Sequence, residues 1–295
     1  MCLLQLPEVN MYNSANAKIF VCSHQNIRLP KNPLLVPLQV GAALADVEFD
    51  GYLRDDDGEN ISSKNRTYCE LTGQYWAWKN TDVSYYGFFH YRRFLYPDTD
   101  AKRPYRFQRA AKNHVLEKLN YEKFSTLIQE YDLIVPKGIE MFTSVRDQYA
   151  SAKFHHREDL ELMESILRKR HPEDIWAMEL YLSSTVQYFG NIFIMRREVF
   201  RDYMGWLFPC LEEYERCADL TGYSPQEMRV VGYLSERLLG IYYTKKQAVL
   251  RTIELPGVYF FDGMDYLKKV AVYNIFPPGT KRRARIKQWV MKNRG

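Results

Sequence analysis

Short apolar runs alternate along the chain with longer segments of mixed polarity. The runs have strand composition, and they span residues 18–22, 83–89, 131–136, 187–195 and 247–253. The first of them, KIFVC, reads as a buried N-terminal strand. Because strands that alternate with helices from such a start form a sheet covered on both faces, the pattern predicts an α/β fold with a largely parallel central sheet.

Helical spacing is clearest in residues 67–80. Its apolar positions fall at i, i+3, i+7 and i+10 and share one face, in the order Tyr68, Leu71, Tyr75 and Trp78. Further helices are expected at residues 109–119, 121–130, 146–154, 158–169, 174–186, 199–217 and 224–239. Pro209 should kink or divide its helix. Ser224, followed by Pro225 and an acidic first turn, should begin the last helix.

Length and cysteine usage narrow the class of protein. The 295 residues suffice for one large domain, predicted at residues 18–275, with a lead-in at 1–17 and a basic tail at 276–295. The five cysteines are scattered and form no CxxC pair, which favours a reducing, cytoplasmic compartment. No apolar run reaches the length of a transmembrane helix, and the N-terminus does not resemble a secretory signal.

The tail from residue 281 to 294 reads KRRARIKQWVMKNR and holds seven basic residues and no acidic one. Apolar residues are interleaved with the basic ones. The segment therefore fits a basic amphipathic helix that lies on an anionic membrane surface, which would place the protein on the inner face of the cytoplasmic membrane. A solvated tail or a segment that docks on a partner protein would have the same composition.

The candidate ligand-binding residues follow the ends of two predicted strands. His24 follows the first strand, and the strand at 83–89 runs into His90, Arg92 and Arg93. Ligands of α/β proteins bind in the crevice at the carboxyl ends of strands, and the forked donors of arginine match phosphate oxygens in pairs. The same residues would also suit a polar turn and a solvated basic strand end beside an aromatic core helix.

Three runs in this part of the chain carry a family resemblance: GENISSKN, YCELTGQYWAWKN and YYGFFHYRRF. Together they resemble a bacterial family found in capsular polysaccharide and exopolysaccharide clusters and first catalogued as a domain of unknown function. Its studied members are glycosyltransferases, including the galactofuranosyltransferase module of an O-antigen polymerase. The resemblance extends from about residue 18 to about residue 254. It implies a GT-A-like, Rossmann-like fold that holds a nucleotide sugar.

The resemblance also implies a reaction. A hexosyl unit, with galactofuranose as the expected sugar, would pass with inversion from a uridine diphosphate sugar to a lipid-linked or oligosaccharide acceptor in cell-surface polysaccharide synthesis. The residues expected to contact the donor are His24, Asn60, Asn65, His90, Arg92 and Arg93.

The chain departs from the ordinary GT-A pattern at one informative place. GT-A enzymes usually end a central strand in Asp-x-Asp, whose carboxylates hold Mg²⁺ or Mn²⁺ against the donor diphosphate. Here the comparable strand ends in His90, Arg92 and Arg93. We therefore expect these groups to neutralise the diphosphate directly, without a metal cofactor. The run from Asp55 to Asp57 is a competing source of carboxylates, although such a run in a Gly-bearing loop is usually solvated.

The acceptor side is less clearly marked. An inverting transfer needs a group that takes the proton of the acceptor hydroxyl, and Glu236 is the first candidate for this base, Asp219 the second, with His90 as a further catalytic residue. Four side chains are candidates for acceptor contacts, the first two through the family resemblance: His156, Asp159, Arg229 and Tyr233. Arg229, Tyr233 and Glu236 lie on one stripe of the 224–239 helix, which would equally suit its solvent face.

A binding module for polyanions or nucleic acid is the alternative to an enzyme. The formal net charge of +5 and the basic tail favour it. The charge is concentrated at the terminus, however, and the sequence contains no RNA- or DNA-binding motif. We therefore expect a nucleotide-sugar donor and a glycan acceptor as partners, and no nucleic acid.

Overall fold

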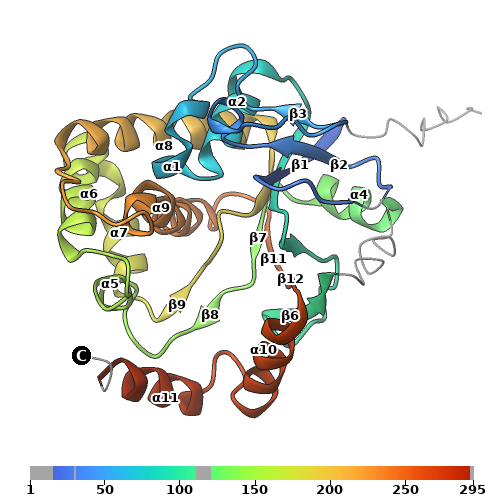
Figure 1. Cartoon of the computed structure of the whole chain (residues 1–295). Coiled ribbons are helices and arrows are strands. Elements are labelled where there is room, and N and C mark those ends of the chain that lie inside the picture. The colour runs from blue at the N-terminus through green and yellow to red at the C-terminus, as the bar shows by residue number, and fades with distance from the viewer. Residues whose placement is uncertain (1–15, 30, 111–120, 293–295) are drawn as a thin grey trace, which may run out of the picture.

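A twisted central sheet with helices on both faces forms the body of the protein (Figure 1). The computed structural model describes residues 16–29, 31–110 and 121–292. The predicted helix at 109–119 and nearly all of the lead-in at 1–17 lie outside the described residues.

Seven strands follow one another across the main part of the sheet. Their order is β11-β7-β10-β4-β1-β2-β3. They span Thr252–Leu255 (β11), Leu133–Pro136 (β7), Phe193–Arg196 (β10), Tyr85–His90 (β4), Ala17–Ser23 (β1), Leu35–Gln39 (β2) and Leu53–Arg54 (β3). Only β10 runs antiparallel to its two neighbours in this path, and the other pairs are parallel. The predicted α/β fold with a largely parallel sheet is confirmed.

Alternation along the strands divides the core into two layers. In β1, Phe20 and Cys22 face one layer, whereas Ile19 and Val21 face the other. The first layer is covered by α2 (Leu71–Asn80), α6 (Arg157–Arg170), α7 (Ile175–Ser183), α8 (Arg197–Cys217) and α9 (Val230–Lys246). The second is covered by α4 (Tyr121–Glu130), which lies on the opposite side of the sheet in Figure 1. Burial on both faces explains why the strands read as continuous apolar runs.

The helix predicted at 67–80 is divided in two. A short helix, α1 (Asn65–Tyr68), ends at Cys69, and α2 begins at Leu71. Cys69 has a φ of 52°, which residues other than glycine rarely adopt. A right-handed α-helix cannot continue through such a residue. The helical spacing of apolar residues continues from α1 into α2, so the sequence gives no sign that the chain changes direction between them.

The strand predicted at 187–195 is also interrupted. Its two ends form β9 (Val186–Gln187) and β10, while Gly190 and Asn191 between them have φ values of 99° and 48°. Glycine inside a strand-like run often marks such a distortion, because it adopts backbone angles that other residues avoid. The distortion turns the chain so that β9 pairs with β8 (Ile139–Glu140) in a separate two-stranded sheet.

Three further boundaries differ from prediction, and one of the two outcomes expected at Pro209, division of the helix, is excluded. Pro209 does not divide its helix, because α8 continues through it to Cys217. Ser224 precedes a 3₁₀ turn, and α9 begins only at Val230 and extends to Lys246. The strand predicted at 247–253 consequently starts later, at Thr252. The helix at residues 146–154 is the shorter α5, Val145–Ala150.

A second group of strands, which sequence reasoning did not predict, extends the sheet at one corner. It consists of β5 (Arg93–Leu95), β6 (Tyr105–Arg109) and β12 (Gly257–Phe261), and α10 (Gly263–Ile275) packs against it. The chain then forms α11 (Lys281–Lys292), at the bottom of Figure 1. Among the described residues, no helix combines the length and apolar character that crossing a bilayer requires.

Candidate functional site

The ends of β1 and β4 bring the first candidate residues together. The two strands are parallel, and their register places Cys22 opposite His90. After β1 the chain builds β2 and β3 on one side and then returns to build β4 on the other side. This reversal of strand order is where open α/β sheets bind ligands, because the loops that follow the two strands diverge there. His24 and Arg92 lie on those loops.

A cavity of about 600 Å³ opens at this point. Its lining is rich in cationic and imidazole side chains, with one carboxylate among them. The described residues that line it are Cys22, His24, Val40, Asn65, Arg66, Cys69, Glu70, His90, Arg92, Tyr223, Pro225, Met228 and Arg229. Four of the residues predicted for the donor, and Arg229 from the predicted acceptor set, therefore meet in one place. We call this space the basic cavity.

Both histidines of the basic cavity are held in the neutral form. Burial lowers the pKa of His90 well below its usual value, and the charges of Arg93 and Arg92 lower it further. Burial, followed by the charges of Arg92 and Arg229, also lowers the pKa of His24. The Nδ1 atom of His90 accepts the backbone N–H of Arg92 at 3.2 Å, so its proton resides on Nε2. The positive charge of the cavity thus comes from arginine, and His90 offers a neutral N–H donor.

Glu70 is a residue of this cavity that sequence reasoning did not select. Burial raises the pKa of its carboxyl group, although Asn191 Nδ2 donates to its Oε1 at 2.9 Å. The same amide nitrogen also donates to the carbonyl of Gly232, so Asn191 links the Glu70 turn to α9. The break at Cys69 turns Glu70 toward the cavity, and a non-glycine residue with positive φ has no signal in one sequence. The Gly-Asn pair inside a strand-like run was the available signal for Asn191.

Arg93 and Glu236 belong to a second, smaller cavity of about 280 Å³. Consecutive arginines on one chain point to different sides, so Arg92 lines the first cavity and Arg93 the second. The Oε1 atom of Glu236 accepts the N–H of Gly190 at 2.9 Å, and its Oε2 accepts from Arg237 Nη1 at 2.8 Å.

Gly190 stands at the boundary of the two cavities. A Cβ atom there would lie 3.3 Å from Arg93 Nη1, and the φ of 99° is unfavourable for any other residue. Asn191, the next residue, donates to Glu70 of the basic cavity at 2.9 Å, so the two spaces adjoin at this turn.

His156, Asp159 and Tyr233 lie behind the cavity lining. Asp159 is buried and accepts the hydroxyl of Tyr223 at 3.0 Å, while the His156 ring stacks on that tyrosine with 4.4 Å between ring centroids. Tyr223 lines the basic cavity. The hydroxyl of Tyr233 donates to the carbonyl of Gln226 at 3.0 Å. These residues therefore position the cavity wall in the described structure.

Asn60 and Asp219 are not among the described residues that line either cavity. The amide nitrogen of Asn60 donates to the carbonyls of Asp56 and Gly58, within its own loop. Asp219 is exposed and accepts the N–H of Thr221 at 2.9 Å. A hydrogen bond from the Thr221 side chain, followed by this one from the backbone, holds the pKa of its carboxyl group below the usual value.

The acidic run is only partly solvated, contrary to the usual interpretation of such loops. Asp55 is fully buried, and its two oxygens accept the N–H groups of Gly41 and Ala42 at 2.9 and 3.0 Å. Asp56 pairs with Arg54 at 2.6 Å. Both carboxylates therefore hold the loop that precedes α1. Asp57 has no such structural role among the contacts that the structure describes.

One group in the described part of the chain could hold a metal by its spacing, namely His171, Glu173 and Asp174. None of the three lines the basic cavity or its smaller neighbour. Asp174 already accepts from Trp206 Nε1 and Lys245 Nζ, at 2.9 and 2.7 Å. The group thus joins α7 to α8 and α9.

Comparison with known proteins assigns the chain to a family and a fold. Residues 18–247 match the family described as a domain of unknown function, DUF4422, and the chain belongs to this family. A solved structure described as the apo form of WbbM, a bifunctional glycosyltransferase, is similar at a TM-score of 0.78 with 31% sequence identity. The match covers 84% of this chain but 46% of that one, so this chain spans less than half of its neighbour. A search of curated proteins found no match. The architecture is the GT-A-like fold that the sequence predicted.

Proposed function

We propose that this protein is a glycosyltransferase, which transfers a sugar from a nucleotide-sugar donor to a glycan acceptor. One observation carries the proposal: the basic cavity lies at the switch point of a GT-A-like sheet, with Arg92, Arg229 and the neutral imidazoles of His24 and His90 in its wall. Guanidinium groups and N–H donors suit a diphosphate. The description of the similar structure as a glycosyltransferase supports the same assignment.

The finer assignment rests on the family resemblance. The donor is a uridine diphosphate hexose, with galactofuranose as the expected sugar, and the acceptor is a lipid-linked or other oligosaccharide in cell-surface polysaccharide synthesis. The anomeric configuration inverts, because a single displacement proceeds from the face opposite the leaving group.

In the proposed reaction an oxygen of the acceptor attacks the anomeric carbon while the bond from that carbon to the diphosphate oxygen breaks. The electron pair leaves with the nucleotide diphosphate, whose growing negative charge Arg92, Arg229 and the Nε2–H of His90 stabilise. The proton of the acceptor hydroxyl passes to Glu236. These donors are already oriented toward the leaving group before the reaction. They therefore stabilise the negative charge of the transition state without the reorganisation that water molecules would need.

Calorimetry with uridine diphosphate, followed by mass spectrometry of products from synthetic acceptors, tests the assignment. We expect stoichiometric binding of the nucleotide and a mass increase of one hexose on the acceptor. Binding of polynucleotides that weakens steeply with salt, without nucleotide binding, would instead identify a polyanion-binding module.

Chelation of divalent metals is expected to leave the activity largely intact. Arginine side chains occupy the strand end where GT-A enzymes usually place carboxylates, while Asp55 and Asp56 are engaged by their own loop. Initial rates with and without EDTA measure this directly. A complete loss that Mn²⁺ restores would contradict the metal-independent proposal and direct attention to Asp57.

We also propose that α11 attaches the enzyme to an anionic membrane surface from the cytoplasmic side. Arg282 and Arg285 are exposed, and reversal of both to glutamate should weaken binding to vesicles containing phosphatidylserine at least about tenfold. The matched control reverses Arg201 and Arg216, which are exposed on α8. Sedimentation with vesicles at low and high salt gives the measurement. Equal binding by both double variants would show that α11 is not the membrane contact.

A further inference from the structure

One face of the strands β6 and β12 is lined by aromatic side chains that do not belong to the core. Alternation along β12 sends Val258 and Phe260 into the second core layer and turns Tyr259 and Phe261 to the opposite face. Phe107 of β6 pairs with Tyr259 in parallel register, so it faces the same way. All three rings are partly exposed.

These rings form a floor with a defined geometry. The centroids of Phe107 and Phe261 are 5.5 Å apart in an edge-to-face arrangement, and those of Phe107 and Tyr259 are 6.4 Å apart. Neither described core cluster includes them. Phe189, from the loop before Gly190, is also partly exposed and contributes a wall. Tyr105 stacks on one face of Tyr259 with 4.8 Å between centroids, and Tyr273 of α10 contacts Phe107, so only part of each ring is open. The open parts face the smaller cavity, and exposed apolar surface in a cavity indicates a binding surface.

The aromatic floor lies within the smaller cavity that contains Arg93 and Glu236. The guanidinium carbon of Arg93 is 5.9 Å from the centre of the Tyr259 ring. Both charged groups adjoin Gly190 at the boundary with the basic cavity. A molecule on the floor would therefore have one end beside the group proposed to accept a proton. Its other end would lie against Phe261 and Lys269, whose Nζ is 4.4 Å from the centre of that ring.

We propose that this aromatic cavity binds the terminal sugar of the acceptor, with a face of the sugar ring stacked on Tyr259 and Phe107 and the reacting hydroxyl directed to Glu236. The inference rests on the proposed glycosyltransferase function. A sugar ring presents C–H groups on its faces and hydroxyls at its rim, which matches an aromatic floor with a carboxylate and a guanidinium at one end. The volume of about 280 Å³ suits a single ring better than a nucleotide sugar.

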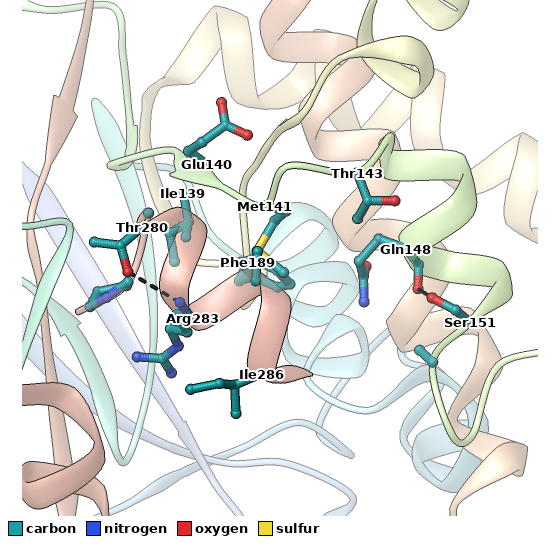
Figure 2. A pocket seen from close by; sticks show the side chains of 14 residues that line it. Ile139, Glu140, Met141, Thr143, Gln148, Ser151, Phe189, Thr280, Arg283 and Ile286 are labelled. Atoms are coloured by element: carbon teal, nitrogen blue, oxygen red, sulfur yellow. Dashed lines mark hydrogen bonds between the residues drawn. The ribbon is translucent and has the colours of Figure 1, made fainter. Parts of the chain in front are cut away.

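This placement replaces the acceptor contacts that the sequence suggested, since His156 and Asp159 lie behind the wall of the basic cavity. It also leaves room for an acceptor longer than one sugar. Ile139 and Phe189 line a further cavity of about 430 Å³ as well, between α5 and α11 (Figure 2). The next part of such an acceptor would pass beneath α11, where Arg283 contributes to the lining.

Kinetics with octyl galactoside as acceptor and uridine diphosphate galactofuranose as donor tests the proposal. Tyr259→Ala should raise the acceptor KM about tenfold or more, the scale of one lost aromatic contact, and leave the dissociation constant of uridine diphosphate unchanged. Tyr259→Phe keeps the ring and should keep the wild-type KM. Phe189→Ala, which changes another aromatic residue of the same cavity, should repeat the effect of Tyr259→Ala. It replaces that variant in the test if circular dichroism shows Tyr259→Ala to be unfolded.

The outcomes separate the subsite from the function on which it rests. A wild-type protein that does not bind uridine diphosphate would overturn the proposed function itself. A wild-type protein that binds the nucleotide, with folded alanine variants whose acceptor KM is unchanged, would overturn the aromatic subsite alone. An equal loss in Tyr259→Phe and Tyr259→Ala would assign the effect to the hydroxyl and would likewise contradict stacking.

Discussion

Replacing Arg92 with alanine is expected to lower turnover about a hundredfold or more and to weaken uridine diphosphate binding about tenfold or more. The first figure is the scale for losing one electrostatic stabiliser of a leaving group, and the second that for one charged hydrogen bond. The guanidinium of Arg92 lies 4.7 Å from the centre of the Tyr91 ring, which holds it at the wall of the basic cavity. Initial rates and calorimetry give the two quantities.

Two further variants sharpen this experiment. Arg92→Lys keeps the charge but loses the fork that contacts two oxygens, so it should recover only part of the activity. Arg93→Ala should also reduce turnover, because its guanidinium lies in the smaller cavity with Glu236, the proposed base, but it should change nucleotide binding less. Arg201→Ala, at an exposed position of α8, is the control. Wild-type activity in both Arg92→Ala and Arg93→Ala would disprove this interpretation of the strand end.

The Glu236→Gln variant should lose about a hundredfold to ten-thousandfold in turnover while binding uridine diphosphate normally. General-base catalysis contributes on this scale, and an amide cannot accept the proton. Glutamine has the same shape and can still accept the N–H of Gly190, which Glu236 accepts at 2.9 Å. The glutamine amide nitrogen cannot accept the hydrogen bond that Arg237 Nη1 donates to Glu236 at 2.8 Å, so circular dichroism first establishes that the variant is folded. Single-turnover rates measured at saturating donor then isolate the chemical step.

Carboxylates elsewhere test whether the effect is specific to Glu236. Glu198→Gln changes an exposed glutamate at the start of α8 that pairs with Arg196, and it should keep wild-type turnover. Asp219→Asn addresses the second base named by the sequence. Loss of turnover in Asp219→Asn, together with retention in Glu236→Gln, would exchange the two roles and require the loop at Asp219 to move to the acceptor.

Most of the sheet could be predicted because burial on both faces leaves a strong local signal. The runs that became β1, β4 and β7 are continuous apolar stretches, and their neighbours have helical spacing. The corner formed by β5, β6 and β12 could not be predicted in this way. Aromatic residues of β6 and β12 face a cavity as well as the core, so no alternation of apolar and polar residues distinguished these strands from loops.

Part of the candidate site could also be predicted from short stretches of the sequence. His24, His90 and Arg92 follow the ends of two strands, and parallel pairing necessarily brings those ends to one edge. Glu70 could not be identified as a cavity residue from the sequence, because it faces the cavity only through the positive φ of Cys69. That turn lies where α1 meets α2 and packs on α9, which are contacts that local spacing does not reveal. The position of Asn60 in its own loop, rather than in the cavity, likewise depends on hydrogen bonds that spacing does not reveal.

By itself the sequence determined the α/β class, the family resemblance, and the cationic strand end at His90, Arg92 and Arg93. These follow from local composition and from pairing rules that hold for any parallel sheet. Only the tertiary structure decided that Arg92 and Arg93 serve different cavities and that Glu236 faces the second one. The physical reason is that a side chain's surroundings are set by elements distant in the chain, here the left-handed turn at Gly190, which joins β9 to β10 and touches both Arg93 and Glu236.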